Sequence, residues 1–274
     1  MIPLAFDYAR PDTLDDAIAL LAEKGEDASV LAGGHSLIPV MKVRLGAPEF
    51  LIDIGRLSEL SYITLDEAAG EVAVGAGTKH REVVDSELLA AEVPLLPAVA
   101  RTVGDPQIRA RGTLGGTLAH ADPAADLPAA ALALDATVVL RGPRGKRNVP
   151  IGEFYTGVFS TVREPDELIV EVRFPRCGDS GWAYEKFTRR SNDWAIVAVA
   201  VSDDRIGLVN MGSTPLRATA TEQALAGGAS IAEAAALAAE GTEPPTDTHG
   251  TPAYRTHLVQ VLTRRALETA HGQR

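Results

Sequence analysis

Cysteine is almost absent from the sequence, since Cys177 is the only one among 274 residues. A single thiol excludes an internal disulfide, and it excludes an iron–sulfur cluster or a multi-cysteine zinc site built by this chain alone. Any iron–sulfur chemistry connected with the protein must therefore be held by another chain.

Basic charge and long apolar runs are also missing. Lys and Arg number 26 against 37 Asp and Glu, a formal net charge of −11, whereas nucleic-acid binding needs an extended basic track. No stretch approaches the roughly 20 apolar residues that cross a bilayer, and the N-terminus lacks a basic region followed by an apolar segment. The sequence predicts a soluble cytoplasmic protein with no nucleic-acid partner and no transmembrane segment.

The N-terminal part predicts a small unit over residues 1–55. Residues 11–25 have the spacing of one amphipathic helix, with Thr13 placed to cap it and Gly25 to end it. Short apolar runs that end in glycine, at 28–33 and 50–55, predict buried strands.

The rest of the chain predicts two further units, over residues 56–176 and 177–274. The middle unit has strand patterns at both ends and helical patterns between them, and the last unit has strands followed by helices, which is typical of a separate α+β domain. Residues 104–126 are dense in Gly, Pro, Asp and Ala, so we expect a long functional loop there.

The stretch LAGGHSLIPV, residues 31–40, has the composition of an anion-binding loop. Gly33 and Gly34 permit a backbone in which successive N–H groups converge, and a helix that starts after His35 and Ser36 adds its unpaired amides. Such donors act at about 3 Å, well inside the screening length of about 8 Å at physiological salt, so the acidic net charge does not forbid a phosphate. The alternative is an ordinary glycine-rich turn between a strand and a helix.

A second glycine pair strengthens the phosphate interpretation. The stretch GTLGGTLAHAD supplies Thr113, Gly115, Gly116 and Thr117, and a dinucleotide lying between two subdomains would be gripped by one loop from each. A Rossmann fingerprint is excluded at VGAGTKH, because His80 stands where the third glycine is required, and no Walker pattern occurs.

Three stretches together resemble a known family: LAGGHSLIPVMKVRLGAPEFLIDI, GDPQIRARGTLGGTLAHADPAADLPAA and DELIVEVRFP. They are similar to the FAD-binding medium subunit of the molybdenum hydroxylases, a group that includes bacterial carbon monoxide dehydrogenase and the flavin domain of xanthine dehydrogenase. The resemblance covers nearly the whole chain. It implies an α+β, vanillyl-alcohol-oxidase (PCMH-type) FAD-binding fold of two subdomains, followed by a C-terminal α+β domain of a three-stranded sheet with helices.

The resemblance also implies roles for individual residues. Residues 32–36 would hold the FAD pyrophosphate, Thr113 to Thr117 would line the phosphates and the ribityl chain, and Asp126 would bind a sugar or ribityl hydroxyl. Ile169 would lie near the adenine or flavin ring, Lys186 would approach the flavin, and Trp194 would cover the isoalloxazine. Thr117 departs from the commoner T-I-G-G-N pattern and lacks the two amide donors of asparagine. The implied cofactor-binding set is Ala32, Gly33, Gly34, His35, Ser36, Thr113, Gly115, Gly116, Thr117, Asp126, Ile169, Lys186 and Trp194.

Some of these residues have simpler interpretations. Asp126 could instead cap a helix that begins at Leu127, and Lys186 could be a solvated strand residue. His120, Asp122 and Asp126 do not make a defined ligand set, so we expect no metal site.

The resemblance implies an oxidoreductase subunit in which no side chain need act as a general acid or base. Electrons would arrive from an iron–sulfur small subunit beside a molybdopterin large subunit, in a dimer of heterotrimers, and leave through FAD to an external acceptor. Two alternatives remain: a free-standing FAD-dependent oxidase or monooxygenase on the same fold, and an interaction scaffold that has lost FAD.

Overall fold

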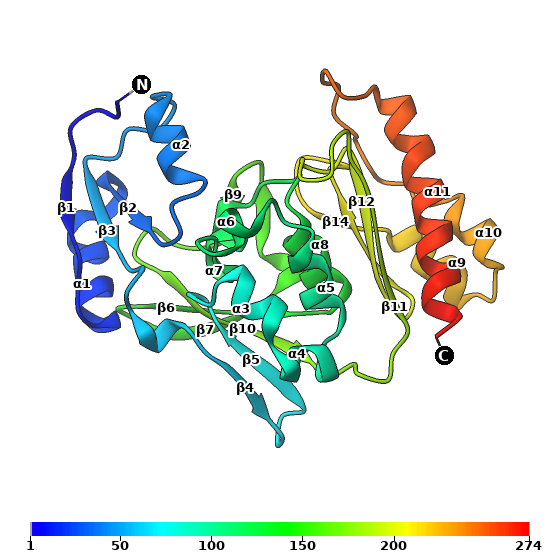
Figure 1. Cartoon of the computed structure of the whole chain (residues 1–274), viewed down its shortest axis with the longest axis horizontal. Coiled ribbons are helices and arrows are strands. Elements are labelled where there is room, and N and C mark those ends of the chain that lie inside the picture. Colours follow the sequence, from blue (N-terminus) through cyan, green and yellow to red (C-terminus); the bar gives the residue numbers. More distant parts are fainter. Residues whose placement is uncertain (1, 274) are drawn as a thin grey trace.

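Three larger β-sheets follow one another along the chain, with a further two-stranded sheet in the middle part, in the computed structural model, which describes residues 2–273 (Figure 1). The first sheet is parallel, with strand order β1-β3-β2, and the connecting helices α1 and α2 lie in the same N-terminal layer. Its elements are β1 (Asp7–Ala9), α1 (Leu14–Lys24), the 3₁₀ turn η1 (Gly25–Asp27), β2 (Ala28–Leu31), α2 (Leu37–Lys42) and β3 (Phe50–Asp53).

Helix α1 confirms the prediction made from its capping residues. The Thr13 side chain accepts a hydrogen bond from the Asp16 N–H, and Gly25 ends the helix with a φ of 57°. The buried stripe of Leu14, Ile18 and Leu21 packs toward β3 and the middle sheet. The local signals of cap, stripe and glycine end all agree here.

The second sheet is antiparallel, with strand order β4-β5-β10-β6-β7. The prediction of strands at both ends of the middle unit is confirmed, because β5 and β10 pair at its centre. The elements are η2 (Ser58–Leu60), β4 (Ile63–Asp66), β5 (Glu71–Gly75), α3 (His80–Asp85), α4 (Glu87–Glu92), α5 (Leu95–Arg101), α6 (Pro106–Arg109), α7 (Leu114–His120), α8 (Asp126–Ala133), β6 (Thr137–Gly142), β7 (Gly145–Pro150), η3 (Ile151–Glu153), the hairpin strands β8 (Tyr155–Gly157) and β9 (Ser160–Thr161), and β10 (Leu168–Pro175).

The prediction of a long loop over residues 104–126 is wrong. Two short helices, α6 and α7, occupy this segment, each started by a capping side chain. Asp105 accepts a hydrogen bond from the Ile108 N–H, and Pro106 stands at the first helical position, where a missing N–H costs nothing. In α7 the glycine at 115 permits close packing against Ala76, whereas no residue of α6 is buried.

The third sheet lies in the C-terminal part and is antiparallel, with order β11-β12-β13-β14. Its three long strands are those that the sequence predicts, and the two-residue β14 is added at the edge. Figure 1 shows α11 lying against the face of β11 and β12 that points away from the middle sheet. The elements are β11 (Trp182–Phe187), β12 (Val197–Ser202), β13 (Arg205–Val209), β14 (Leu216–Arg217), α9 (Thr219–Ala226), α10 (Ile231–Ala235) and α11 (Pro252–His271).

Helix α8 lies between the middle and C-terminal sheets (Figure 1). All eight of its residues are buried, and Gly207 on β13 approaches it so closely that a Cβ there would lie 2.0 Å from the Ala129 carbonyl oxygen. A helix that is apolar on every side is expected where both faces are covered. Within residues 2–273, no helix is long and apolar enough to span a membrane.

Candidate cofactor-binding site

The first glycine loop, residues 32–36, connects β2 to α2. Gly34 has a φ of 78°, and its carbonyl accepts the N–H of Ile38 to begin the helix. Among the hydrogen bonds of residues 2–273, none uses the backbone N–H groups from Gly33 to Leu37. The loop therefore presents a run of unpaired main-chain donors, as the sequence predicts for an anion site.

The two glycine loops touch each other. A Cβ added to Gly33 would lie 2.3 Å from the carbonyl oxygen of Arg111 and 3.0 Å from the Cα of Gly112. The second loop follows directly, because Thr113 is the N-cap of α7. The structure thus brings the two predicted loops into one site, although they come from different sheets.

The second loop uses its backbone differently from the first. The Gly115 N–H donates to the Ala76 carbonyl at 2.8 Å, the Gly116 N–H donates to Thr113 Oγ1 at 3.1 Å, and the Thr117 N–H donates to the Thr113 carbonyl. A Cβ on Gly115 would lie 2.5 Å from the Ala76 Cβ, so this glycine is required for close packing. The sequence argument expected free amides here, but of these residues only Thr113 has a backbone N–H without an acceptor among residues 2–273.

His80 lies at the junction of the loops, and the sequence analysis did not identify it as a site residue. Its backbone N–H donates to the Gly112 carbonyl at 2.9 Å, and its ring edge packs on Gly112, where a Cβ would lie 2.7 Å from Nε2. Burial lowers the pKa of His80 to about 4, with smaller contributions from His35 and Arg109. The imidazole is neutral at pH 7, and its buried Nδ1 has no hydrogen-bond partner among the described residues.

Asp126 and Lys186 form a buried ion pair. The Lys186 Nζ lies 2.9 Å from Asp126 Oδ2 and 3.2 Å from the Thr102 carbonyl, while the Tyr184 hydroxyl donates to Asp126 Oδ1. The helix-cap interpretation of Asp126 is wrong, because Ala125 is the N-cap of α8 and Asp126 is its first residue. Lys186 is likewise no solvated strand residue, since only 9% of its side chain is exposed.

Ile169 and Trp194 lie in contrasting surroundings. Ile169 is buried in the core of the middle sheet, next to a bulge where β10 changes register against β6. Trp194 belongs to the loop between β11 and β12. Its side chain is 60% exposed and lines a cavity of about 490 Å³. Ala124 lines the same cavity, which places Trp194 close to the segment that carries Asp126.

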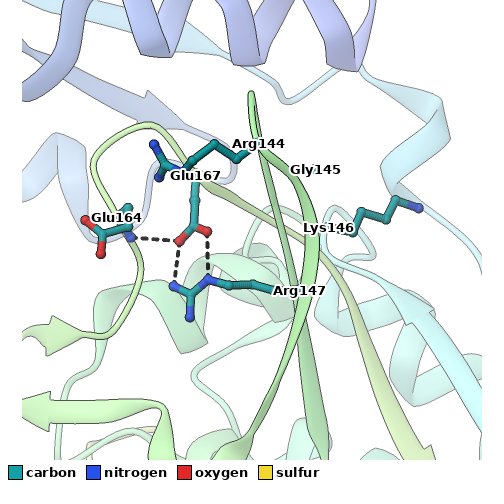
Figure 2. Close-up of a pocket in the computed structure, with 6 residues that line it drawn as sticks. All are labelled: Arg144, Gly145, Lys146, Arg147, Glu164 and Glu167. Atoms are coloured by element: carbon teal, nitrogen blue, oxygen red, sulfur yellow. Dashed lines mark hydrogen bonds and ion pairs between the residues drawn. The ribbon is translucent and has the colours of Figure 1, made fainter.

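A smaller hollow of about 230 Å³ lies on the β6–β7 hairpin, and none of the predicted site residues lines it (Figure 2). Figure 2 shows the Arg147 guanidinium paired with Glu167, which also accepts the Glu164 N–H at 2.8 Å. These groups satisfy one another, so the hollow has the character of a surface ion-pair cluster. Across residues 2–273, no group of three His, Cys, Asp or Glu side chains is arranged to hold a metal ion.

Comparisons with known proteins agree with the fold. Residues 4–177 match the family described as FAD binding domain in molybdopterin dehydrogenase, and residues 182–270 match the CO dehydrogenase flavoprotein C-terminal domain. The chain therefore belongs to the FAD-binding subunits of the molybdopterin dehydrogenases, and the resemblance seen in its sequence motifs is confirmed.

Individual relatives match over nearly their full length. The carbon monoxide dehydrogenase medium chain of Hydrogenophaga pseudoflava is 41% identical over 98% of each chain, and the alpha subunit of the 6-hydroxypseudooxynicotine dehydrogenase complex of Paenarthrobacter nicotinovorans is 37% identical over 98% of this chain and 96% of its own. A solved carbon monoxide dehydrogenase from Hydrogenophaga pseudoflava superposes with a TM-score of 0.95 at 41% identity, covering 100% of this chain and 99% of that one. Quinoline 2-oxidoreductase from Pseudomonas putida 86 gives 0.92 at 33% identity, covering 100% and 99%.

The residues present fit FAD, the cofactor of this family. The run of unpaired N–H groups from Gly33 to Leu37 suits an anionic diphosphate, and the lack of a Cβ at Gly33 lets the Arg111–Gly112 backbone lie directly against this loop. The buried Nδ1 of His80 is a polar atom at the loop junction that still lacks a partner among the described residues. An unpartnered buried polar atom such as His80 Nδ1 is costly in a closed protein interior and useful beside a polar ligand.

Proposed function

We propose that the chain holds FAD between its two glycine loops and acts as the electron outlet of a molybdenum-containing dehydrogenase complex. Residues 32–36 bind the diphosphate through main-chain N–H groups, and residues 113–117 line the phosphates and the ribityl chain. Asp126 binds a sugar or ribityl hydroxyl, Lys186 approaches the flavin, Ile169 lies near a ring of the cofactor, and Trp194 covers the isoalloxazine. Bound FAD supplies the redox chemistry, because it takes up electrons from a donor and passes them to an acceptor.

The observation that carries this proposal is the contact between the two loops at Gly33 and Arg111. It places the unpaired amides of the first loop beside the capped start of α7, so a diphosphate held by the first loop also lies against the second. The protein's own residues bind and orient the cofactor, and none is required as an acid or base. His35, which is exposed, contributes to the site through its backbone N–H.

Competition between nucleotides tests the proposal directly. The purified chain is titrated with FAD, riboflavin and ADP while flavin fluorescence is followed. Riboflavin lacks the diphosphate and loses several charge-assisted hydrogen bonds of about 1.5–3 kcal/mol each, so we expect it to bind at least about a hundredfold more weakly than FAD. ADP should displace FAD. Equal affinities for FAD and riboflavin, or no displacement by ADP, would contradict a diphosphate site.

The same proposal includes two partner chains. One is an iron–sulfur small subunit, required because this chain has only Cys177 and builds no cluster of its own, and the other is a molybdopterin large subunit. Exposed apolar side chains support a subunit role: Leu45 and Ile2 are 84% and 81% exposed, and Phe159 is 57% exposed.

We further propose a dimer of heterotrimers in the cytoplasm, and the division 1–55, 56–176 and 177–274 into two FAD-binding subdomains and a C-terminal domain.

Isolation from the native source tests the assembly. We expect a tagged chain to co-purify with an iron–sulfur protein and a large subunit that contains molybdenum, with one FAD for each copy of the chain. Steady oxidation of an organic substrate by the chain alone, with oxygen as the acceptor, would instead support a free-standing flavin oxidase.

A further inference from the structure

A buried polar cluster joins three elements of different origin. Tyr184 and Lys186 are two residues apart on β11, so both side chains project from the same face of that strand. They meet Asp126, the first residue of α8, and the carbonyl of Thr102 at the end of α5. The cluster thus ties the C-terminal sheet to the helices of the middle unit.

The cluster is not explained by stability alone. Asp126 is 5% exposed, and removing both charges of an ion pair from water costs several kcal/mol per ion, so a buried pair is commonly no more stable than an apolar replacement. The pair of Arg147 and Glu167 in Figure 2 differs, because 43% of the Arg147 side chain remains exposed and water can complete its hydrogen bonds. Lys186 has no comparable access to water.

The hydrogen bonds of the cluster leave some donor and acceptor positions of Lys186 and Asp126 unused. The ammonium of Lys186 has three N–H donors, of which the described residues use two, one to Asp126 and one to the Thr102 carbonyl. Each carboxylate oxygen of Asp126 accepts one hydrogen bond, from Tyr184 or from Lys186, and each keeps a further lone pair. A buried ion pair with one donor and two acceptor positions unused can form hydrogen bonds to a polar ligand.

The Tyr184 hydroxyl holds one oxygen of this pair, Asp126 Oδ1, in a hydrogen bond. Burial beside Asp126 raises the pKa of Tyr184 well above its ordinary value, so the hydroxyl keeps its proton and donates. Burial also raises the pKa of Asp126, while Lys186 and the Tyr184 hydroxyl act in the opposite direction. Removing the hydroxyl takes away one of the two side chains that favour the ionised carboxylate, and Lys186 is the other.

We propose that Tyr184 is a positioning residue of the FAD site, whose hydroxyl orients Asp126 so that the Asp126–Lys186 pair presents its unused donor and acceptors to the cofactor. This inference rests on the proposed function, which assigns Asp126 and Lys186 to FAD but leaves Tyr184 without a role.

The test compares two tyrosine variants of the full chain. Tyr184→Phe keeps the ring and removes the hydroxyl. Tyr62→Phe is the matched control, because the Tyr62 hydroxyl also donates to a partly buried carboxylate, that of Glu171 on β10. Both variants lose one tyrosine–carboxylate hydrogen bond, so both should lower the unfolding midpoint in urea.

Their cofactor affinities should differ. A hydrogen bond to a charged group is equivalent to roughly a tenfold change in a binding constant, so we expect the Kd for FAD to rise about tenfold in Tyr184→Phe and to stay unchanged in Tyr62→Phe. FAD affinity of Tyr184→Phe should also begin to fall at a higher pH than in the unmodified chain, because the pKa of Asp126 rises further. Asp126→Asn, which cannot titrate, should bind FAD weakly at every pH in the same range.

The outcomes distinguish a failure of the Tyr184 inference from a failure of the proposed FAD-binding function. If the unmodified chain binds FAD with displacement by ADP, but Tyr184→Phe and Tyr62→Phe share its Kd and pH profile, Tyr184 has no positioning role and only this inference fails. If the unmodified chain does not bind FAD, the proposed function fails and this inference fails with it. Should Tyr184→Phe not fold, a pH-dependent FAD affinity in the unmodified chain that is also present in Asp126→Asn would overturn the inference.

Discussion

At the scale of single residues, the candidate site depends on two glycines that lack a Cβ atom. Gly33 allows two segments far apart in sequence to meet because it has no Cβ, and Gly115 does the same against Ala76. The sequence pattern predicts the same role, that of a phosphate-binding loop, for both glycine pairs, but their backbone N–H groups are used differently. One glycine leaves a backbone N–H unpaired and another permits close packing, and the difference depends on which segment lies beside each of them. The sequence alone does not show which distant segment that is.

Gly33→Ala tests the contact between the loops. The new Cβ would lie 2.3 Å from the Arg111 carbonyl oxygen, so one loop must move, and overpacking of this kind costs about 1–3 kcal/mol. We expect a lower midpoint of urea unfolding and FAD lost during gel filtration. Gly152→Ala is the control, because a Cβ there meets no atom within 4 Å. Retention of FAD by Gly33→Ala at the level of the control would refute the shared diphosphate site.

His80 predicts an acid-sensitive contribution to stability. Its pKa is about 4 in the folded chain against 6.5 in an exposed histidine, so above pH 6.5 neither state binds the proton and stability is complete. As the pH falls from 6.5 to 4, the unfolded chain is protonated first, and the free energy of unfolding drops by about 3 kcal/mol at roughly 1.4 kcal/mol per pKa unit.

His80→Gln should remove this loss, while His257→Gln, at an exposed position on α11, should retain it. The measurement is the free energy of unfolding from urea titrations between pH 4 and pH 7. Parallel curves for His80→Gln and the unmodified chain would show that His80 does not titrate in this range.

At the scale of elements, the sequence was most informative where capping and periodicity agree, as in α1. It failed over residues 104–126, because short helices depend on caps and tertiary packing more than on composition. Ser86 is another boundary set by a cap, since it ends α3 and caps α4 through a hydrogen bond from the Leu89 N–H. Tyr184 was missed although it precedes Lys186 by two residues on a strand, a spacing that could have identified it.

Thr113→Ala tests the start of α7. Thr113 Oγ1 accepts the Gly116 N–H, and loss of a capping hydroxyl costs about 1 kcal/mol. We expect a lower urea midpoint and weaker FAD binding, because the second loop then loses its fixed shape. Thr113→Ser keeps the oxygen and should behave like the unmodified chain, so equal effects of the two substitutions would exclude the cap as the cause.

At the scale of the whole molecule, α8 determines how the middle and C-terminal sheets are joined. The sequence predicted this helix from its spacing at residues 127–134, but it could not show that both faces are covered, because an alanine-rich helix has no polar side to indicate its orientation. The approach of Gly207 to Ala129, and the pairing of Asp126 with Lys186 across the same boundary, arise only when the two parts are assembled. The Asp126–Lys186 pair therefore forms only where the middle part and the C-terminal part of the chain pack together.

Gly207→Ala tests whether this junction makes the two parts unfold together. A Cβ at position 207 would lie 2.0 Å from the Ala129 carbonyl oxygen, so α8 and β13 must separate. Both tryptophans, Trp182 and Trp194, belong to the C-terminal part, so their fluorescence follows that part while far-ultraviolet circular dichroism follows the whole chain. We expect coincident urea transitions by the two probes in the unmodified chain, and an earlier fluorescence transition in Gly207→Ala. Coincident transitions at an unchanged midpoint in the variant would mean that α8 accommodates the methyl group and that the junction does not couple the two parts.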